Sequence, residues 1–171
     1  MNQKNDNFKA FVIKTVEKFL SILSFIFPLI EISYYFGSKV FLSADSLILK
    51  SFYIAYIKPL TLFYQENTYP VFIFMVVVFI VCSRGSLPLS QYARFNIIQA
   101  ILVSIICSCI SFIYALLPVF LRESSIGLLF ANFFYLGVIL LIAYSAILIF
   151  YGRYPTIPVI SEAAKLQVQR Y

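Results

Sequence analysis

The segment QYARFNIIQA, residues 91–100, opens an apolar run that continues to Leu121. A run of this length exceeds the about 20 residues that a helix needs to cross the hydrocarbon core of a bilayer. Three polar side chains, those of Arg94, Asn96 and Gln99, lie at its beginning. Since a membrane helix can begin with apolar residues alone, these side chains indicate anchoring, helix packing or a functional contact.

The composition of the chain is typical of a polytopic membrane protein. Of its 171 residues, 62% are hydrophobic and 12% are charged, whereas soluble domains are about a quarter charged. So short a chain cannot enclose this much apolar surface, so lipid must cover it. The apolar residues form continuous runs and do not alternate with polar ones, which predicts an all-α membrane protein and argues against a transmembrane β-barrel.

The apolar runs predict a single membrane domain, residues 1–171, with four transmembrane helices. The spans are expected at about residues 19–36, 69–82, 95–121 and 126–151, followed by a C-terminal tail at residues 152–171. Residues 45–64 mix apolar and aromatic side chains with two lysines, and no uncharged window there has the length of a span. They predict an interfacial amphipathic helix between spans one and two, with a fifth, marginal span as the alternative.

The basic residues predict the orientation of the chain. Nine of the 13 Lys and Arg residues lie in the N-terminal segment, the connection between spans two and three, and the C-terminal tail. In a four-span protein these segments share one side, so both termini are expected on the cytoplasmic side or its organellar equivalent. The net charge of +6 does not indicate nucleic-acid binding, because the basic residues are spread singly along the chain and form no cluster.

Small and weakly polar residues form a stripe along one face of the third span. Its members, which we call the small-residue stripe, are Ala93, Asn96, Ala100, Ser104, Cys107, Ser111 and Ala115, at steps of three or four. Such residues let helix backbones approach closely and exchange hydrogen bonds. Two interpretations stay open: the stripe packs against a neighbouring span, or it lines a polar path. Gly127 and Ala131 have the same kind of spacing and could form a partner surface.

Glu31 is the only carboxylate deep within an apolar run. An ionised carboxylate there costs several kcal/mol unless it is paired or hydrated. One interpretation places Glu31 near the far headgroup layer, beside Tyr34 and Tyr35, because tyrosine marks membrane boundaries. The other makes it a functional group within the membrane.

The sequence contains no pattern typical of an active site. It has no histidine and no glycine-rich phosphate-binding loop, so acid–base, nucleophilic and metal chemistry lack their usual residues. Cys107 and Cys109 are two residues apart, which directs them to nearly opposite sides of a helix. They and Cys82 are expected to act as small hydrophobic side chains. The chain is therefore predicted to be a non-enzyme without a cofactor.

Four patches of this sequence resemble one family. The segment Arg94-Phe95-Asn96-x-x-Gln99-Ala100 resembles the central signature of the twenty-kilodalton subunit of the Tic complex, the protein-import translocon of the chloroplast inner envelope. The other patches are Pro28-Leu29-Ile30-Glu31, Lys58-Pro59-Leu60 and Pro155-x-Ile157-Pro158-x-Ile160-Ser161-Glu162-Ala163. They follow the order of the family and extend over most of the chain.

This resemblance implies a four-span protein of the plastid inner envelope membrane with both termini in the stroma. It implies a channel-forming or channel-associated role in moving precursor polypeptides, together with other membrane subunits, in a hetero- or homo-oligomer within the lipid bilayer. The N-terminal residues have no signal-peptide or transit-peptide pattern, which suits a plastid-encoded member or a cyanobacterial one in the plasma membrane.

Two further functions stay open from the residues alone. A small-solute or ion carrier could use Glu31 and the small-residue stripe, although few charged groups lie within the predicted spans. A structural or assembly subunit would have no conduit. The residues expected to pack helices or line a path are Glu31, Arg94, Asn96, Gln99, Ala100, Ser104 and Ser111.

Overall fold

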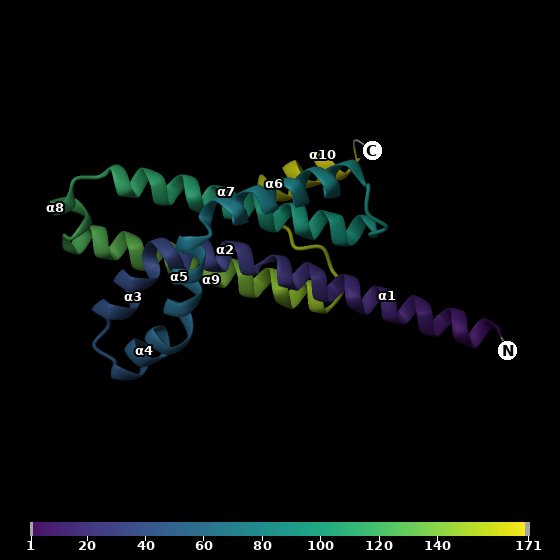
Figure 1. Ribbon diagram of the computed structural model, residues 1–171, viewed down its shortest axis with the longest axis horizontal. Coiled ribbons are helices and arrows are strands. Elements are labelled where there is room, and N and C mark those ends of the chain that lie inside the picture. Colours follow the sequence, from purple (N-terminus) through teal and green to yellow (C-terminus); the bar gives the residue numbers. More distant parts are fainter. Residues whose placement is uncertain (1, 170–171) are drawn as a thin grey trace.

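The computed structural model describes residues 2–169, in which every regular element is a helix (Figure 1). The first helical segment consists of α1 (Asn2–Ser24), α2 (Ile26–Ile32), the π-helical turn η1 (Ser33–Gly37) and α3 (Ser38–Ser43). The side arm consists of α4 (Leu47–Phe52), the π-helical turn η2 (Tyr53–Ile57) and α5 (Lys58–Glu66). The remaining helices are α6 (Thr68–Arg84), α7 (Gln91–Leu116), α8 (Val119–Arg122), α9 (Ser125–Phe150) and α10 (Ile160–Gln169). The all-helical prediction is confirmed.

Three helices are long and apolar enough to cross a membrane: Phe11–Ser43, α7 and α9. A fourth candidate is a bent pair, Leu47–Glu66 with α6, whose two parts meet at an angle of 84°. The described part of the chain therefore has three candidate spans, or four if the bent pair crosses as one. The side arm that contains the predicted interfacial helix, residues 45–64, is the first half of this pair.

Prolines account for two interruptions in the long helices. Pro28 has no backbone N–H to bond to the carbonyl of Ser24, and the helix divides there into α1 and α2. Leu117 precedes Pro118 and has an extended backbone, with φ −66° and ψ 143°, because proline disfavours helical conformation in the residue before it. Consequently α7 ends at Leu116, whereas the sequence predicts a span continuing to Leu121.

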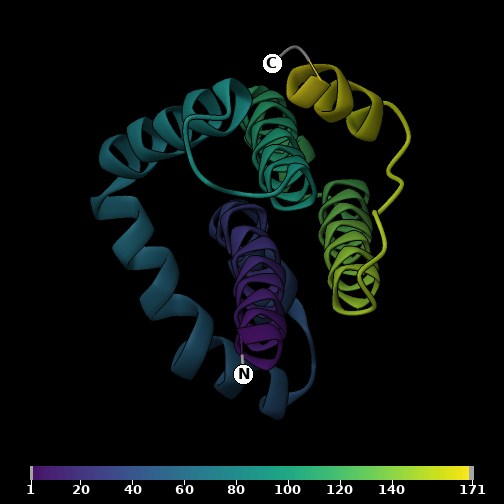
Figure 2. The ribbon, with the colours of Figure 1, turned by 90° about the vertical axis from the view of Figure 1, so that its right-hand side faces the viewer.

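Helix α7 is bordered on several sides by other helices (Figure 2). It contacts α1, α2, α6 and α10, and α9 packs against α1, α2 and α3. One part of the core joins Phe25, Ala100 and Ile149, and a larger part surrounds Phe36 and Cys107. The first turns of α1 and helix α10 lie at the same end of the bundle (Figure 1).

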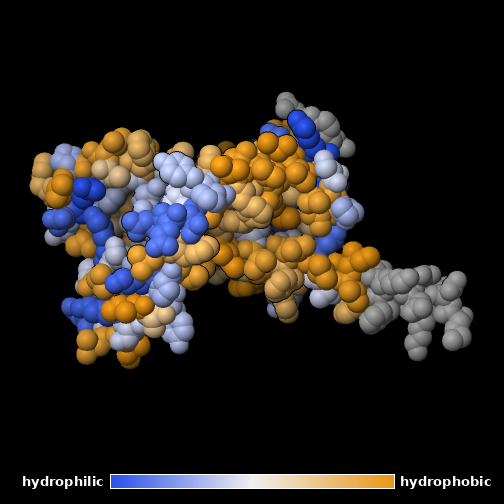
Figure 3. All heavy atoms as spheres, in the orientation of Figure 1, coloured by the Kyte–Doolittle hydropathy of each residue, from blue (hydrophilic) through white to orange (hydrophobic). Residues whose placement is uncertain are grey.

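The outside of the bundle is strongly apolar. Hydrophobic residues cover much of the face shown in Figure 3, and on α9 the side chains of Phe133 and Phe150 are 80% and 72% exposed. Exposed apolar surface of this extent requires lipid or partner helices.

Candidate functional site

The small-residue stripe forms the buried seam between α7 and its neighbours. Six of its seven members are at most 1% exposed, and Ala115 at the end is exposed. Ala100 packs with Phe25 and Ile149, and Cys107 packs within the cluster around Phe36. In this conformation the stripe packs against neighbouring helices.

Several polar atoms along this seam have no hydrogen-bond partner. Among the residues that the structure describes, they include both amide atoms of Asn96, Oε1 of Gln99, and the hydroxyls of Ser104 and Ser111. A buried polar group without a partner costs about 1–3 kcal/mol, and such groups in native proteins call for an explanation. Asn96 is the clearest case, because neither atom of its side-chain amide makes a hydrogen bond of good geometry at 0% exposure, and its polar neighbour is the Tyr92 hydroxyl one turn earlier on α7.

Arg94 joins three helix ends. Its Nε donates to the carbonyl of Cys82 at 2.7 Å, and one terminal nitrogen donates to Ser83 at 3.2 Å and to Val168 at 3.5 Å. The last carbonyls of a helix have no partner within that helix and carry partial negative charge. Gly85, with φ +67°, ends α6 in the left-handed conformation beside the guanidinium group. Arg94 therefore caps α6 and holds α10.

Gln99 joins α7 to the C-terminal tail. Its Nε2 donates to the hydroxyl of Ser161 at 3.0 Å and to the carbonyl of Pro155 at 3.4 Å. The Ser161 hydroxyl also accepts from the backbone N–H of Ile157 at 2.7 Å. The amide thus fixes the turn that leads into α10.

Glu31 lies buried where three helices meet, at 2% exposure. Its carboxylate accepts hydrogen bonds from Ser108 of α7, at 2.5 Å, and from the hydroxyl of Tyr64 near the end of α5. Ser108 flanks the small-residue stripe. Through these bonds Glu31 joins the bend between α5 and α6 to the bundle. Its position relative to the headgroup layer stays a prediction.

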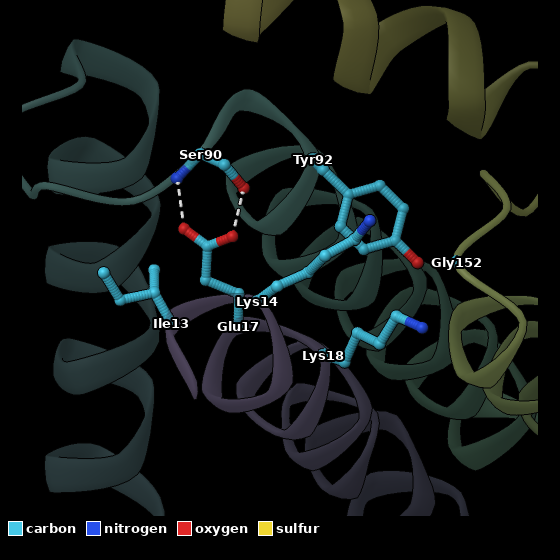
Figure 4. A pocket seen from close by; sticks show the side chains of 7 residues that line it. All are labelled: Ile13, Lys14, Glu17, Lys18, Ser90, Tyr92 and Gly152. Carbon is cyan, nitrogen blue, oxygen red and sulfur yellow. Dashed lines mark hydrogen bonds between the residues drawn. The ribbon is translucent and has the colours of Figure 1, made fainter. Parts of the chain in front are cut away.

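Two charged residues of α1, Glu17 and Lys18, belong to no sequence pattern that indicates a site, and they join α1 to the rest of the bundle (Figure 4). Both Glu17 carboxylate oxygens accept hydrogen bonds from Ser90, one from the backbone N–H at 2.7 Å and one from the hydroxyl at 2.6 Å. Lys18 Nζ donates to the carbonyl of Phe150, the last residue of α9, at 3.0 Å. A negative group at a helix start and a positive group at a helix end both complement the helix dipole.

The predicted site residues therefore do not converge on one pocket. They are distributed along α7, with Arg94 and Gln99 at the tail, the small-residue stripe in the seam and Glu31 beside Ser108. Within the described residues, no three His, Cys, Asp or Glu side chains are placed to hold a metal ion. Long apolar helices around a buried, partly polar central helix define a polytopic α-helical membrane protein.

Comparison with known proteins gives the family. No protein-family model matches the chain. It is 34% identical over 155 residues to a Tic20 family protein of Synechocystis sp., covering 90% of this chain and 93% of that relative. It is 32% identical over 158 residues to the Tic20 family protein Ycf60 of Gracilaria tenuistipitata var. liui, covering 91% and 77%. The chain belongs to the Tic20 family, which confirms the resemblance of its motifs.

Proposed function

We propose that this chain is a subunit of a protein translocon in the plastid inner envelope membrane, and that α7 lines the path of precursor polypeptides. A cyanobacterial plasma membrane is the alternative location. Membership of the Tic20 family supports a role in protein translocation. Both described ends of the chain lie at one end of the bundle (Figure 1), which agrees with two stromal termini, and the role requires no catalytic chemistry.

The unpaired polar atoms in the seam carry the proposal for α7. An extended polypeptide presents a backbone donor and acceptor at nearly every residue. If α7 separates from α1 and α2, Asn96, Ser104 and Ser111 face such a chain and gain the partners that they lack in the closed bundle. The side chains that are unfavourable in the closed state are therefore useful in the open one. The small number of helices implies that other subunits or further copies complete the path.

Replacing Asn96 by leucine separates a path-lining role from a packing role. Because the amide has no partner, Asn96→Leu should leave the thermal unfolding midpoint unchanged or raise stability by about 1 kcal/mol. Import of a precursor into membranes that contain the variant should nevertheless fall severalfold.

The matched control is Asn132→Leu, because Asn132 lies on an exposed face of α9 and its replacement should alter neither property. If Asn96→Leu destabilises the protein as much as it slows import, the amide is a structural residue and the proposal for α7 is wrong.

Crosslinking to a stalled precursor tests the whole seam. In a chain without its own cysteines, single cysteines at positions 96, 100, 104 and 111 should react with the precursor. Cysteines at Ile105, Phe112 and Ile113, which are 42–63% exposed on the outer face of α7, should not.

Equal reaction on both faces would contradict a path along the seam. If the seam is silent and a bulky replacement of Ala100 dissociates the complex, the chain is an assembly subunit. If it is silent and solute flux depends on Glu31, the chain is a carrier.

A further inference from the structure

A cavity of about 560 Å³ opens where α1 meets the start of α7 and the end of α9. Its lining includes Lys14, Glu17 and Lys18 of α1, Tyr92 of α7, and Gly152 just after α9 (Figure 4). Since α7 begins at Gln91 and α9 ends at Phe150, the cavity lies at the level where two membrane-spanning helices end. Lipid headgroups occupy this level of a bilayer.

The charged groups around this cavity leave positive charge for a ligand. Both oxygens of Glu17 are engaged by Ser90, so this carboxylate is directed to the start of α7. Lys18 uses one of its three N–H donors on the carbonyl of Phe150. In the described part of the chain no hydrogen bond involves the ammonium group of Lys14.

The two lysines are one helical turn apart and lie on the same face of α1. Figure 4 shows both side chains extending from α1 toward the space beside Tyr92 and Gly152. Gly152 has φ +74°, a conformation that favours glycine, and it lies next to the end of Lys18, since a Cβ there would be 3.4 Å from the Lys18 Nζ. Around them α1 exposes apolar side chains such as Ile13 and Val16, at 58% and 50%, which suit acyl chains.

We propose that this cavity binds an anionic phospholipid, with the phosphate between Lys14 and Lys18 and the acyl chains along the apolar face of α1. Bound there, the lipid ties α1 to the ends of α7 and α9 at the positive side of the membrane. The site is independent of whether α7 lines a translocation path.

Native mass spectrometry of the full chain in mild detergent tests this site. With added phosphatidylglycerol, the wild-type protein should retain one lipid, and with phosphatidylcholine none. Each lysine changed to glutamine should weaken retention about fivefold, the effect of one cation near an anionic headgroup. Lys14→Arg with Lys18→Arg should preserve retention, because the charge is kept.

Lys50→Gln with Lys58→Gln is the matched control, since these lysines lie on the side arm, and it should bind like the wild type. Lys14→Gln alone suffices if loss of the Lys18 bond to Phe150 impairs folding. The proposal is overturned if Lys50→Gln with Lys58→Gln loses as much lipid as Lys14→Gln with Lys18→Gln. It is also overturned if phosphatidylcholine is retained as well, or if inorganic phosphate displaces the lipid completely and so accounts for all the binding.

Discussion

Replacing Gly127 by alanine is expected to destabilise the turn between α8 and α9 by about 3 kcal/mol, as overpacking at a rigid contact does. A Cβ atom at this position would lie 2.4 Å from the carbonyl oxygen of Leu121 and 2.6 Å from that of Arg122. Both are backbone atoms, which cannot rotate away as a side chain does. The turn itself must therefore move.

Movement of this turn would break a small hydrogen-bond network. The hydroxyl of Tyr114 donates to the carbonyls of Arg122 and Gly127, at 3.0 and 3.2 Å, and Lys39 Nζ lies 3.3 Å from the Arg122 carbonyl. These bonds join α3, α7 and α9 at the end of the bundle opposite the termini. Replacement of Gly127 should therefore weaken the packing of all three helices.

Gly137→Ala provides the matched control for Gly127→Ala. It is the same substitution in the same helix, and a Cβ at Gly137 meets no atom within 4 Å. This variant should be neutral or stabilise α9 by about 0.5–1 kcal/mol, because alanine favours a helix more than glycine does. Thermal unfolding of both variants in the same detergent measures the difference, and equal midpoints would contradict the close contact at Gly127.

The sequence alone predicts the local patterns of this protein well. The length of the apolar runs predicts membrane helices. The spacing of the small-residue stripe predicts a packing face, and six of its seven members are buried in the structure. The sequence singles out Gly127 as a small residue at a helix contact. In the structure the atoms nearest to a Cβ at this position belong to the preceding turn, and Tyr114 of α7 donates to its carbonyl. Periodicity shows which face of a helix is special and does not show what covers it.

The contacts that join the helices could not be predicted in the same way. Glu17 and Ser90 are separated by 73 residues, and Glu31 and Ser108 by 77. No local pattern relates such pairs, since they depend on how the helices pack. In the sequence, a charged residue near the end of an apolar run resembles a membrane anchor. The sequence does not show whether that residue also bonds the end of another helix, as Lys18 does at Phe150.

Arg94→Leu is expected to destabilise the protein by about 3 kcal/mol or more and to release α10. The guanidinium group makes three hydrogen bonds to the carbonyls of Cys82, Ser83 and Val168, and bonds to a charged group contribute about 1.5–3 kcal/mol each. Leucine would remove this donor from the carbonyls of Ser83 and Val168 and would leave the carbonyl of Cys82 only the long bond from the backbone N–H of Gly85, at 3.4 Å. Thermal unfolding should report the loss, and proteolysis of the C-terminal tail should accelerate.

The conservative variant shows why this position requires arginine. Lysine keeps the charge, but its single ammonium group cannot reach two helix ends at once as the planar guanidinium group does. The stability of Arg94→Lys should therefore lie between those of the wild type and Arg94→Leu. Arg84→Leu removes an exposed arginine at the end of α6 and should lie within about 0.5 kcal/mol of the wild type. If Arg94→Lys were as stable as the wild type, charge alone would explain Arg94 as a membrane anchor. If the stability of Arg94→Lys is intermediate, the polar start of α7 serves chiefly to hold α6 and α10 in place. Helix packing then explains Arg94, and Asn96 is the first polar residue of α7 that it does not explain.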